Sequence, residues 1–350
     1  MKDDIDTMER RENEFQRNLL LEEFLKDLNC NLAEAEQKLT HIRYKQYPVV
    51  FVMGALRSGT TLMMQWLANT GEFAYPSNFI SRFYRAPIIG AKIQRLLFDP
   101  TLNFRNEISD FSQHVDYCSQ NGKTRGALAP NEFWYFWRRF MPYESLPVDY
   151  LPDTDLCTVF DKDTFIHELM GIASVFDKPL AMKGMIANYN IGFLNAVFDK
   201  AVFVYIKREI GTNIESVLEA RKRQYGNEKE WYSFRIPEMQ GLKNIENPAE
   251  QIAGQLYYIN QAIETGLENV EERKKVIVEY EDFCNEPHKY YHILQEHLAE
   301  QGCDIAKNYR GFRKFEVSRT QAGTEIYEAH LKFMNRVKMQ GGYEFKSLPE

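Results

Sequence analysis

Short apolar segments alternate along this chain with longer stretches whose apolar residues have helical spacing. The first apolar segment is PVVFVMG (Pro48–Gly54), and the helical stretch TTLMMQWLAN (Thr60–Asn69) follows it. Three further apolar segments come later in the chain: PLAMKGM (Pro179–Met185), AVFVYIK (Ala201–Lys207) and KVIVEY (Lys275–Tyr280). Apolar strands separated by helices are typical of a parallel sheet that is covered on both faces. The pattern therefore predicts an α/β fold with three layers, α/β/α, around a central parallel sheet.

Residues 1–45, ahead of the first strand, are predicted to form a helical N-terminal extension. Their apolar positions make a heptad-like seam that is too short to specify a coiled coil. The seam fits either a helix laid across the domain surface or a contact between the subunits of a homo-oligomer. It consists of Leu21, Leu25, Leu28, Leu32, Ala35 and Leu39.

Residues 46–345 are predicted to form a single domain, because no repeat or low-complexity linker interrupts them. Within this domain, residues 75–175 carry many aromatic residues and few strand signals. We therefore expect a helical insertion between the first two strands, serving as a lid. In its WYFW run, Trp134, Tyr135 and Trp137 either line a pocket or belong to the core of the insertion.

The turn after the first strand has the features of an anion-binding loop. GALRSGTT lies between a buried strand and a helix, so backbone N–H groups and the positive helix end face its ligand. The glycines at 54 and 59 let the backbone curl around a phosphate. A nucleoside-triphosphate loop reads GxxxxGK[ST], but here Thr60 takes the lysine position and the cation is Arg57. The loop therefore favours one phosphate-like group over ATP or GTP hydrolysis. The expected contacts are Arg57, Ser58, Gly59, Thr60 and Thr61.

A second cation follows the strand predicted at Ala201–Lys207. Arg208 lies just past the end of this strand, and Ser216 lies eight residues later on the next helix. A guanidinium and a hydroxyl placed in this way can bind one phosphate from two sides. The alternative is a surface salt bridge for Arg208 and a solvated serine.

These motifs, taken in order, resemble those of sulfotransferases that use 3′-phosphoadenosine 5′-phosphosulfate (PAPS). RSGTT resembles the 5′-phosphosulfate loop of bacterial and tyrosylprotein sulfotransferases, whereas cytosolic sulfotransferases carry a lysine in place of Arg57. Arg208 and Ser216 resemble the family's 3′-phosphate site, and Tyr280 begins a segment similar to its YED motif. The resemblance covers residues 48 to about 287.

The resemblance implies a P-loop-like fold and the transfer of a sulfuryl group from PAPS, without a metal. The acceptor is expected to be a hydroxyl or amine of a glycan, a lipid or a small molecule, bound against residues 75–175. Two other functions stay open: a P-loop kinase acting on a small molecule, and a nucleotide-binding protein that has lost its activity.

In-line transfer needs groups that stabilise the leaving oxygen and the sulfuryl oxygens. Arg57 suits the first task, since it adjoins the phosphate loop. Lys183, in an apolar strand, suits the second, and a buried ion pair is its alternative. The resemblance to the tyrosylprotein enzymes implies a further serine late in the chain, which Ser318 matches less closely.

The proton acceptor is the point at which the chain departs from those relatives. They carry a glutamate some twenty residues past the loop arginine, whereas counting that distance here leads to Asn78, whose amide cannot act as a base. Glu132 is the first candidate base, with a charge at a helix N-terminus as its alternative. His114 is the second candidate, with a surface or core histidine as its alternative.

Charge and composition narrow the partners and the compartment. The net charge of −7 argues against a nucleic-acid partner, which needs a basic face. The five cysteines include no CxxC pair, and the charged N-terminus has no apolar core of a signal peptide. Because no apolar run approaches the ~20 residues of a membrane span, we expect a cytoplasmic protein. His288 and His292 share a helix face, but no further ligand accompanies them, so no metal site is expected.

Overall fold

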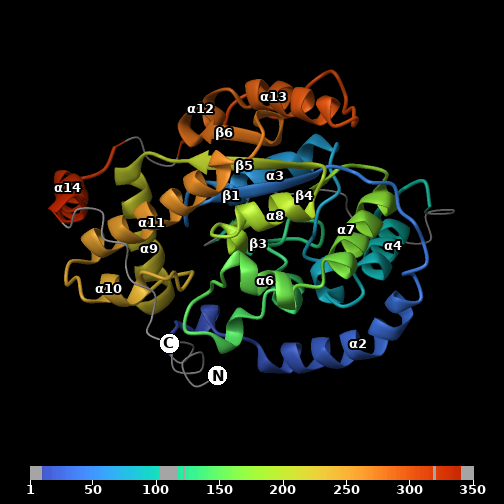
Figure 1. Cartoon of the computed structure of the whole chain (residues 1–350), viewed down its shortest axis with the longest axis horizontal. Coiled ribbons are helices and arrows are strands. Elements are labelled where there is room, and N and C mark those ends of the chain that lie inside the picture. Colours follow the sequence, from blue (N-terminus) through green and yellow to red (C-terminus); the bar gives the residue numbers. More distant parts are fainter. Residues whose placement is uncertain (1–9, 103–116, 118, 121–122, 318–320, 340–350) are drawn as a thin grey trace.

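A four-stranded parallel sheet with the order β4-β1-β5-β6 lies at the centre of the molecule (Figure 1). The computed structural model describes residues 10–102, 117, 119–120, 123–317 and 321–339. The predicted α/β fold with a central parallel sheet is confirmed, and each predicted strand is present. The strands are β1 (Val49–Gly54), β4 (Leu180–Lys183), β5 (Ala201–Lys207) and β6 (Lys275–Glu279).

Helices cover both faces of this sheet, which explains why β1, β4 and β5 are buried on both sides, whereas the edge strand β6 is buried on one side only. In β1, Val50 and Val52 face one layer, while Phe51 and Met53 face the other. The first layer contains α3 (Thr60–Thr70), α12 (Tyr280–Asn285) and α13 (Pro287–Glu300). The second layer contains α8 (Ile191–Val197), α9 (Ile210–Tyr225), α10 (Met239–Lys243) and α11 (Pro248–Glu268), and α14 (Thr324–Met339) packs against α9 and α11. Short 3₁₀ turns lie at η5 (Met185–Ala187) and η6 (Glu272–Lys274).

In the described part of the chain between α3 and β4, most regular structure is helical. Its buried aromatic side chains, Trp137, Phe136 and Phe165 among them, join the core beneath the sheet. Within the WYFW run, Phe136 and Trp137 are core, whereas Trp134 is half-buried and Tyr135 is exposed. The insertion contains η2 (Ile80–Phe83), α4 (Pro87–Phe98), the hairpin β2 (Ser119–Gln120) and β3 (Lys123–Thr124), α5 (Trp134–Phe140), η4 (Tyr143–Ser145), α6 (Asp153–Val159) and α7 (Lys162–Phe176).

The N-terminal helix is shorter than predicted. Over residues 10–45 the structure has a 3₁₀ turn η1 (Asn13–Phe15) and the helix α2 (Leu19–Gln37) in place of one continuous helix, and residues 1–9 lie outside the described residues. The α-helix begins after Asn18, whose side chain accepts a hydrogen bond from the Leu21 amide and caps it.

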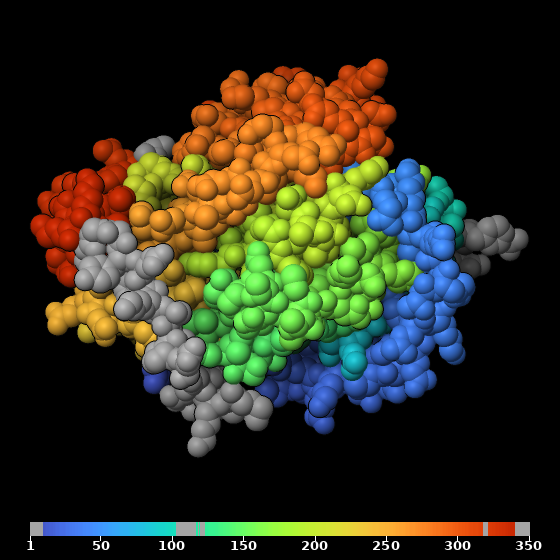
Figure 2. Space-filling view, in the orientation of Figure 1, coloured from blue at the N-terminus to red at the C-terminus, as the bar shows by residue number. Residues whose placement is uncertain are grey.

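Helix α2 lies along the outer edge of the insertion (Figures 1 and 2). Two buried polar side chains attach it there. Asn29 donates to the Arg82 carbonyl at 2.8 Å, and Glu36 accepts from the amides of Ile88 and Ile89 at the start of α4. This attachment matches the first of the two arrangements predicted for the seam. Among the described residues, no helix combines the length and the hydropathy needed to cross a bilayer.

Candidate active site

The loop Gly54–Thr61 lies at the carboxyl edge of the sheet, between the end of β1 and the start of α3. This is where ligands bind in open α/β sheets, since the chain continues from β1 to neighbours on both sides of it. Gly59 has φ of 104°, and a Cβ there would lie 2.3 Å from the ring of Tyr280. Arg57 itself has φ of 59°, in the left-handed region. The backbone therefore needs glycine at 59 to fold tightly against the next wall of the site.

Three side chains hold the carbonyl groups of this loop. The amide of Asn188 donates to Gly54 O and that of Asn213 donates to Leu56 O, each at 2.9 Å. Arg208 Nη1 donates to Arg57 O, also at 2.9 Å. The first N–H groups of α3 have no partner within the helix, so they are available to an anion.

The structure brings Arg57, Ser216 and Arg208 together. Arg57 Nε donates to Ser216 Oγ at 3.2 Å, and Arg208 lies 4.9 Å above the ring of Tyr280. Burial, followed by the charge of nearby Arg57, lowers the pKa of Arg208. Two guanidinium groups thus share a half-buried region, an arrangement that favours an anionic ligand.

Lys183, at the end of β4, is buried and forms an ion pair. Its Nζ donates to Glu132 Oε1 and to Thr61 Oγ1, both at 2.8 Å. The indole of Trp134 donates to the other carboxylate oxygen of Glu132. A carboxylate from the insertion therefore meets a lysine from the sheet directly beside the loop Gly54–Thr61. The buried ion pair predicted as the alternative for Lys183 is present, and its partner is the first candidate base.

A cavity of about 210 Å³ opens between these groups. One wall comes from the segment Tyr232–Phe234, which sequence reasoning missed, and in which Ser233 has φ of 72°. Trp134 lines the cavity, whereas Trp137 reaches only a small apolar hollow beside it. The lining residues are Leu56, Arg57, Gly59, Thr60, Thr61, Leu62, Ser119, Glu132, Trp134, Lys183, Met185, Arg208, Tyr232, Ser233, Phe234 and Tyr280.

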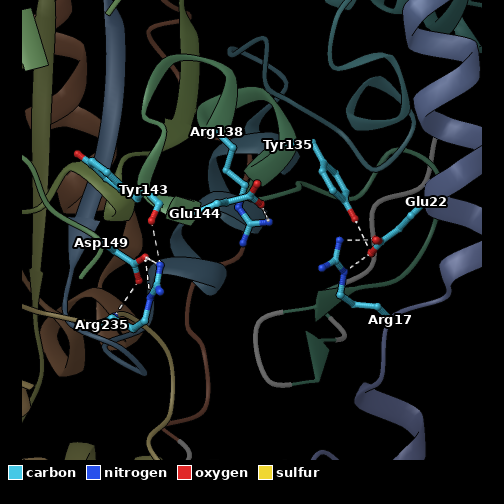
Figure 3. Close-up of polar contacts among 8 residues, drawn as sticks. All are labelled: Arg17, Glu22, Tyr135, Arg138, Tyr143, Glu144, Asp149 and Arg235. Atoms are coloured by element: carbon cyan, nitrogen blue, oxygen red, sulfur yellow. Dashed lines mark hydrogen bonds and ion pairs between the residues drawn. The ribbon is translucent and has the colours of Figure 1, made fainter. Parts of the chain in front are cut away.

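Figure 3 shows polar contacts beside these walls, and one of them, the Arg235–Asp149 ion pair, joins the Tyr232–Phe234 segment to the insertion. Arg235, next to the Tyr232–Phe234 segment, donates to Asp149 of the insertion at 2.7 Å and to Tyr143 O at 3.0 Å. Tyr135 donates to Glu22 of α2 at 3.0 Å, so it does not line the cavity. The segment and the insertion are therefore joined by a half-buried contact beside the site.

Asn78, Ser58 and Ser216, all named from the sequence, are not among the residues that line the cavity. Asn78 donates to Gly126 O at 2.9 Å and to Thr124 Oγ1 at 3.1 Å within the insertion. His114 and Ser318 lie outside the described residues. Asn188 and Asn213 were missed, since an asparagine buried against a loop has no distinctive spacing in the sequence. Within the described ranges, no three His, Cys, Asp or Glu side chains are grouped to hold a metal ion.

Comparison with known proteins adds the following findings. A family model described as "Sulfotransferase family" matches residues 48–301. The crystal structure of sulfotransferase STF9 from Mycobacterium avium is similar over 91% of this chain and 74% of that chain, with a TM-score of 0.50 and 12% identity. Sulfotransferase STF1 from Mycobacterium tuberculosis H37Rv matches over 86% and 75%, with a TM-score of 0.47 and 14% identity. A search of curated proteins found no match.

Proposed function

This chain belongs to the sulfotransferase family, and from that premise we propose that it moves a sulfuryl group from PAPS to a hydroxyl or amine of a small-molecule, lipid or glycan acceptor. The observation that carries the proposal is the convergence of Arg57, Ser216 and Arg208 at the loop after β1. A nucleotide with phosphates at both its 3′ and 5′ positions needs cations and hydroxyls at two places, and this loop region supplies both.

The residues present fit the donor. Ser58 Oγ is buried and has no hydrogen-bond partner among the residues that the structure describes, which suits a site that receives a polar ligand. Ser58, Thr60, Thr61 and the N-terminus of α3 would hold the 5′-phosphosulfate, while Arg208 and Ser216 would hold the 3′-phosphate. Arg57 connects these two sets of residues, since it lies in the loop, its side chain donates to Ser216 and its carbonyl accepts from Arg208.

Bound PAPS would supply the sulfuryl group and leave as adenosine 3′,5′-bisphosphate once the acceptor oxygen or nitrogen has bonded to sulfur. Arg57 stabilises the charge that develops on the leaving oxygen, and Lys183 stabilises the sulfuryl oxygens. Glu132 takes the proton of the acceptor. Its two oxygens already accept from Lys183 and Trp134, and each retains a second lone pair for the acceptor group.

The proposal is tested by titrating the protein with PAPS and adenosine 3′,5′-bisphosphate in a calorimeter, and by assaying transfer from labelled PAPS to sugars, phenols, lipids and amines. Removing a charge-assisted hydrogen bond costs ~1.5–3 kcal/mol, so we expect Arg208→Ala to weaken bisphosphate binding about 10- to 100-fold.

The matched control is Arg273→Ala, because Arg273 is exposed and lies at the opposite end of the sheet, just before β6. It should bind like the wild type. Failure of the wild-type protein to bind either nucleotide would disprove the proposal, as would magnesium-dependent ATP turnover in place of sulfuryl transfer.

A further inference from the structure

Asn78 contacts the segment that carries Glu132. Its side-chain amide donates to Gly126 O at 2.9 Å and to Thr124 Oγ1 at 3.1 Å, on the approach to that segment. The Asn78 oxygen accepts from Asn131 Nδ2 at 2.8 Å. Both ends of one amide group are therefore used to hold the chain immediately before the candidate base.

Asn131 extends this contact past Glu132. Its own oxygen accepts from the Phe133 amide at 2.8 Å, so one side chain links the residues on either side of Glu132. Phe133 has φ of 59°, a conformation that a bulky residue adopts only when its surroundings enforce it. The ring of Phe133 is buried and stacks on Phe136 at 4.4 Å. The turn that directs the Glu132 side chain is thus fixed by the amide pair on one side and by the core on the other.

Main-chain contacts already attach this segment to the rest of the insertion. The Asn78 amide donates to Ala129 O at 2.8 Å, and the Asn131 amide donates to Pro76 O at 2.8 Å. These bonds do not need the side chains of Asn78 and Asn131. The backbone bonds therefore attach the segment, and the side-chain bonds of Asn78 and Asn131 fix the orientation of the turn around Glu132.

We propose that Asn78 and Asn131 are positioning residues that direct the Glu132 carboxylate toward Lys183 and the cavity. This inference rests on the proposed function, in which Glu132 accepts the proton of the acceptor. Asn78 then acts through Asn131 and Glu132, without touching the substrate. Asn78, whose amide cannot itself act as a base, thus helps to orient Glu132, which can.

A double-mutant cycle tests the proposal on the full chain. A misplacement of about 1 Å at a reacting group can cost as much as ~100-fold, so we expect Asn78→Ala to lower kcat about 10- to 100-fold. The affinity for adenosine 3′,5′-bisphosphate should stay within about twofold, since Asn78 lies outside the phosphate loop. If Asn78 acts through Glu132, adding Asn78→Ala to Glu132→Gln should lower kcat by less than about twofold more. A double variant whose loss is the product of the two single losses would overturn the proposal.

Ser81→Ala is the matched control. Ser81 Oγ donates to Asn78 O at 2.8 Å, so this variant removes a neighbouring hydrogen bond and leaves the Asn78 amide in place. Its kcat should stay within about twofold of the wild-type value. A loss in Ser81→Ala equal to that in Asn78→Ala would assign the effect to general loosening of the segment and overturn the proposal.

Crystal structures of the two variants separate this inference from the proposed function. In Asn78→Ala the Glu132 carboxylate should no longer lie within hydrogen-bond distance of Lys183 Nζ, whereas Ser81→Ala should keep that contact. An unchanged 2.8 Å contact in Asn78→Ala would overturn the positioning role, even if the wild type proves active. If the wild type transfers nothing from PAPS, the proposed function fails, while these structures still decide the positioning.

Discussion

The two sides of the cavity are built in different ways. The loop Gly54–Thr61 is a continuous piece of chain, set between a strand and a helix and held by Asn188, Asn213 and Arg208. The opposite side, which we call the acceptor wall, combines Glu132 and Trp134 of the insertion with the segment Tyr232–Phe234. A loop formed by adjacent residues depends on local backbone geometry, whereas a wall formed by distant segments depends on how those segments are joined.

The largest effect is expected from placing a side chain at the tightest point of the loop. In Gly59→Ala the new Cβ would meet the Tyr280 ring at 2.3 Å, so we expect overpacking to add ~1–3 kcal/mol to the cost of the positive φ, and bisphosphate binding to fall below detection. Urea unfolding and calorimetry measure the two effects. Gly71→Ala is the control, because its φ is 75° and nothing lies within 4 Å of the added Cβ. Equal losses in the two variants would contradict the steric account.

The next effect tests the junction of the two sides. Lys183 contacts both Thr61 of the loop and Glu132 of the acceptor wall. If it stabilises charge in the transition state, Lys183→Met should lower kcat ~100-fold or more and change bisphosphate affinity much less. Lys162→Met, at an exposed position at the start of α7, should behave as the wild type. A fall in bisphosphate affinity as large as the fall in kcat would make Lys183 a binding residue only.

The free energy of unfolding should depend on pH through one buried carboxyl group of the insertion, that of Glu168. Burial, offset in part by Arg139, raises the pKa of Glu168 on α7 to about 7. The folded protein therefore holds this proton more tightly than the unfolded chain, whose glutamates titrate near ~4.3. The stabilisation is present in full below that value and is lost as the pH rises through about 7. The whole loss is ~3–4 kcal/mol, of which ~2–3 kcal/mol falls between pH 5 and pH 8.

Unfolding by urea at pH 5 and pH 8 measures this difference. We expect it to shrink in Glu168→Gln, which cannot titrate, and to persist in Glu34→Gln, at an exposed position on α2. An identical difference in the wild type and in Glu168→Gln would show that another group is responsible.

The smallest effect is expected at the ion pairs of Figure 3, which allow a direct comparison. Arg235 and Asp149 are each about three-quarters buried and join two parts of the acceptor side. Arg138 and Glu144 are more exposed and lie within the insertion. We expect Arg235→Ala to cost ~1–2 kcal/mol and to raise the KM of the acceptor, and Arg138→Ala to cost under ~0.5 kcal/mol. Equal unfolding free energies and KM values in the two variants would show that the Arg235–Asp149 ion pair does not stabilise the acceptor wall.

This contrast also explains which features could be predicted from the sequence. The strands and the phosphate loop depend on residues that are adjacent in the chain, so hydrophobic pattern and glycine spacing were sufficient. The proximity of Arg57 to Arg208 and Ser216 was implied only by the resemblance to sulfotransferases, in which the two phosphate sites bind one nucleotide. Over residues 10–45 the predicted helix is interrupted, because the cap at Asn18 sets the start of α2.

The acceptor wall could be predicted only in part. Glu132 and Trp134 were named as candidates. The sequence near Glu132 does not show that it faces Lys183, because that contact forms only when the insertion packs against the end of β4. The segment Tyr232–Phe234 was missed, because its turn depends on a positive φ at Ser233, which cannot be predicted from a serine. The contacts of Asn78 and Asn131 likewise depend on tertiary structure.

The ring of Tyr280 lies between the loop Gly54–Thr61 and Arg208. Tyr280 touches the space beside Gly59 on one edge and supports the guanidinium of Arg208 on its face. The position of the Arg208 guanidinium relative to the loop therefore depends on this ring as well as on the hydrogen bond from Arg208 to Arg57 O. A side chain of another size at position 280 would shift Arg208 relative to Gly59, and with it the spacing of anionic groups that the proposed site would accept.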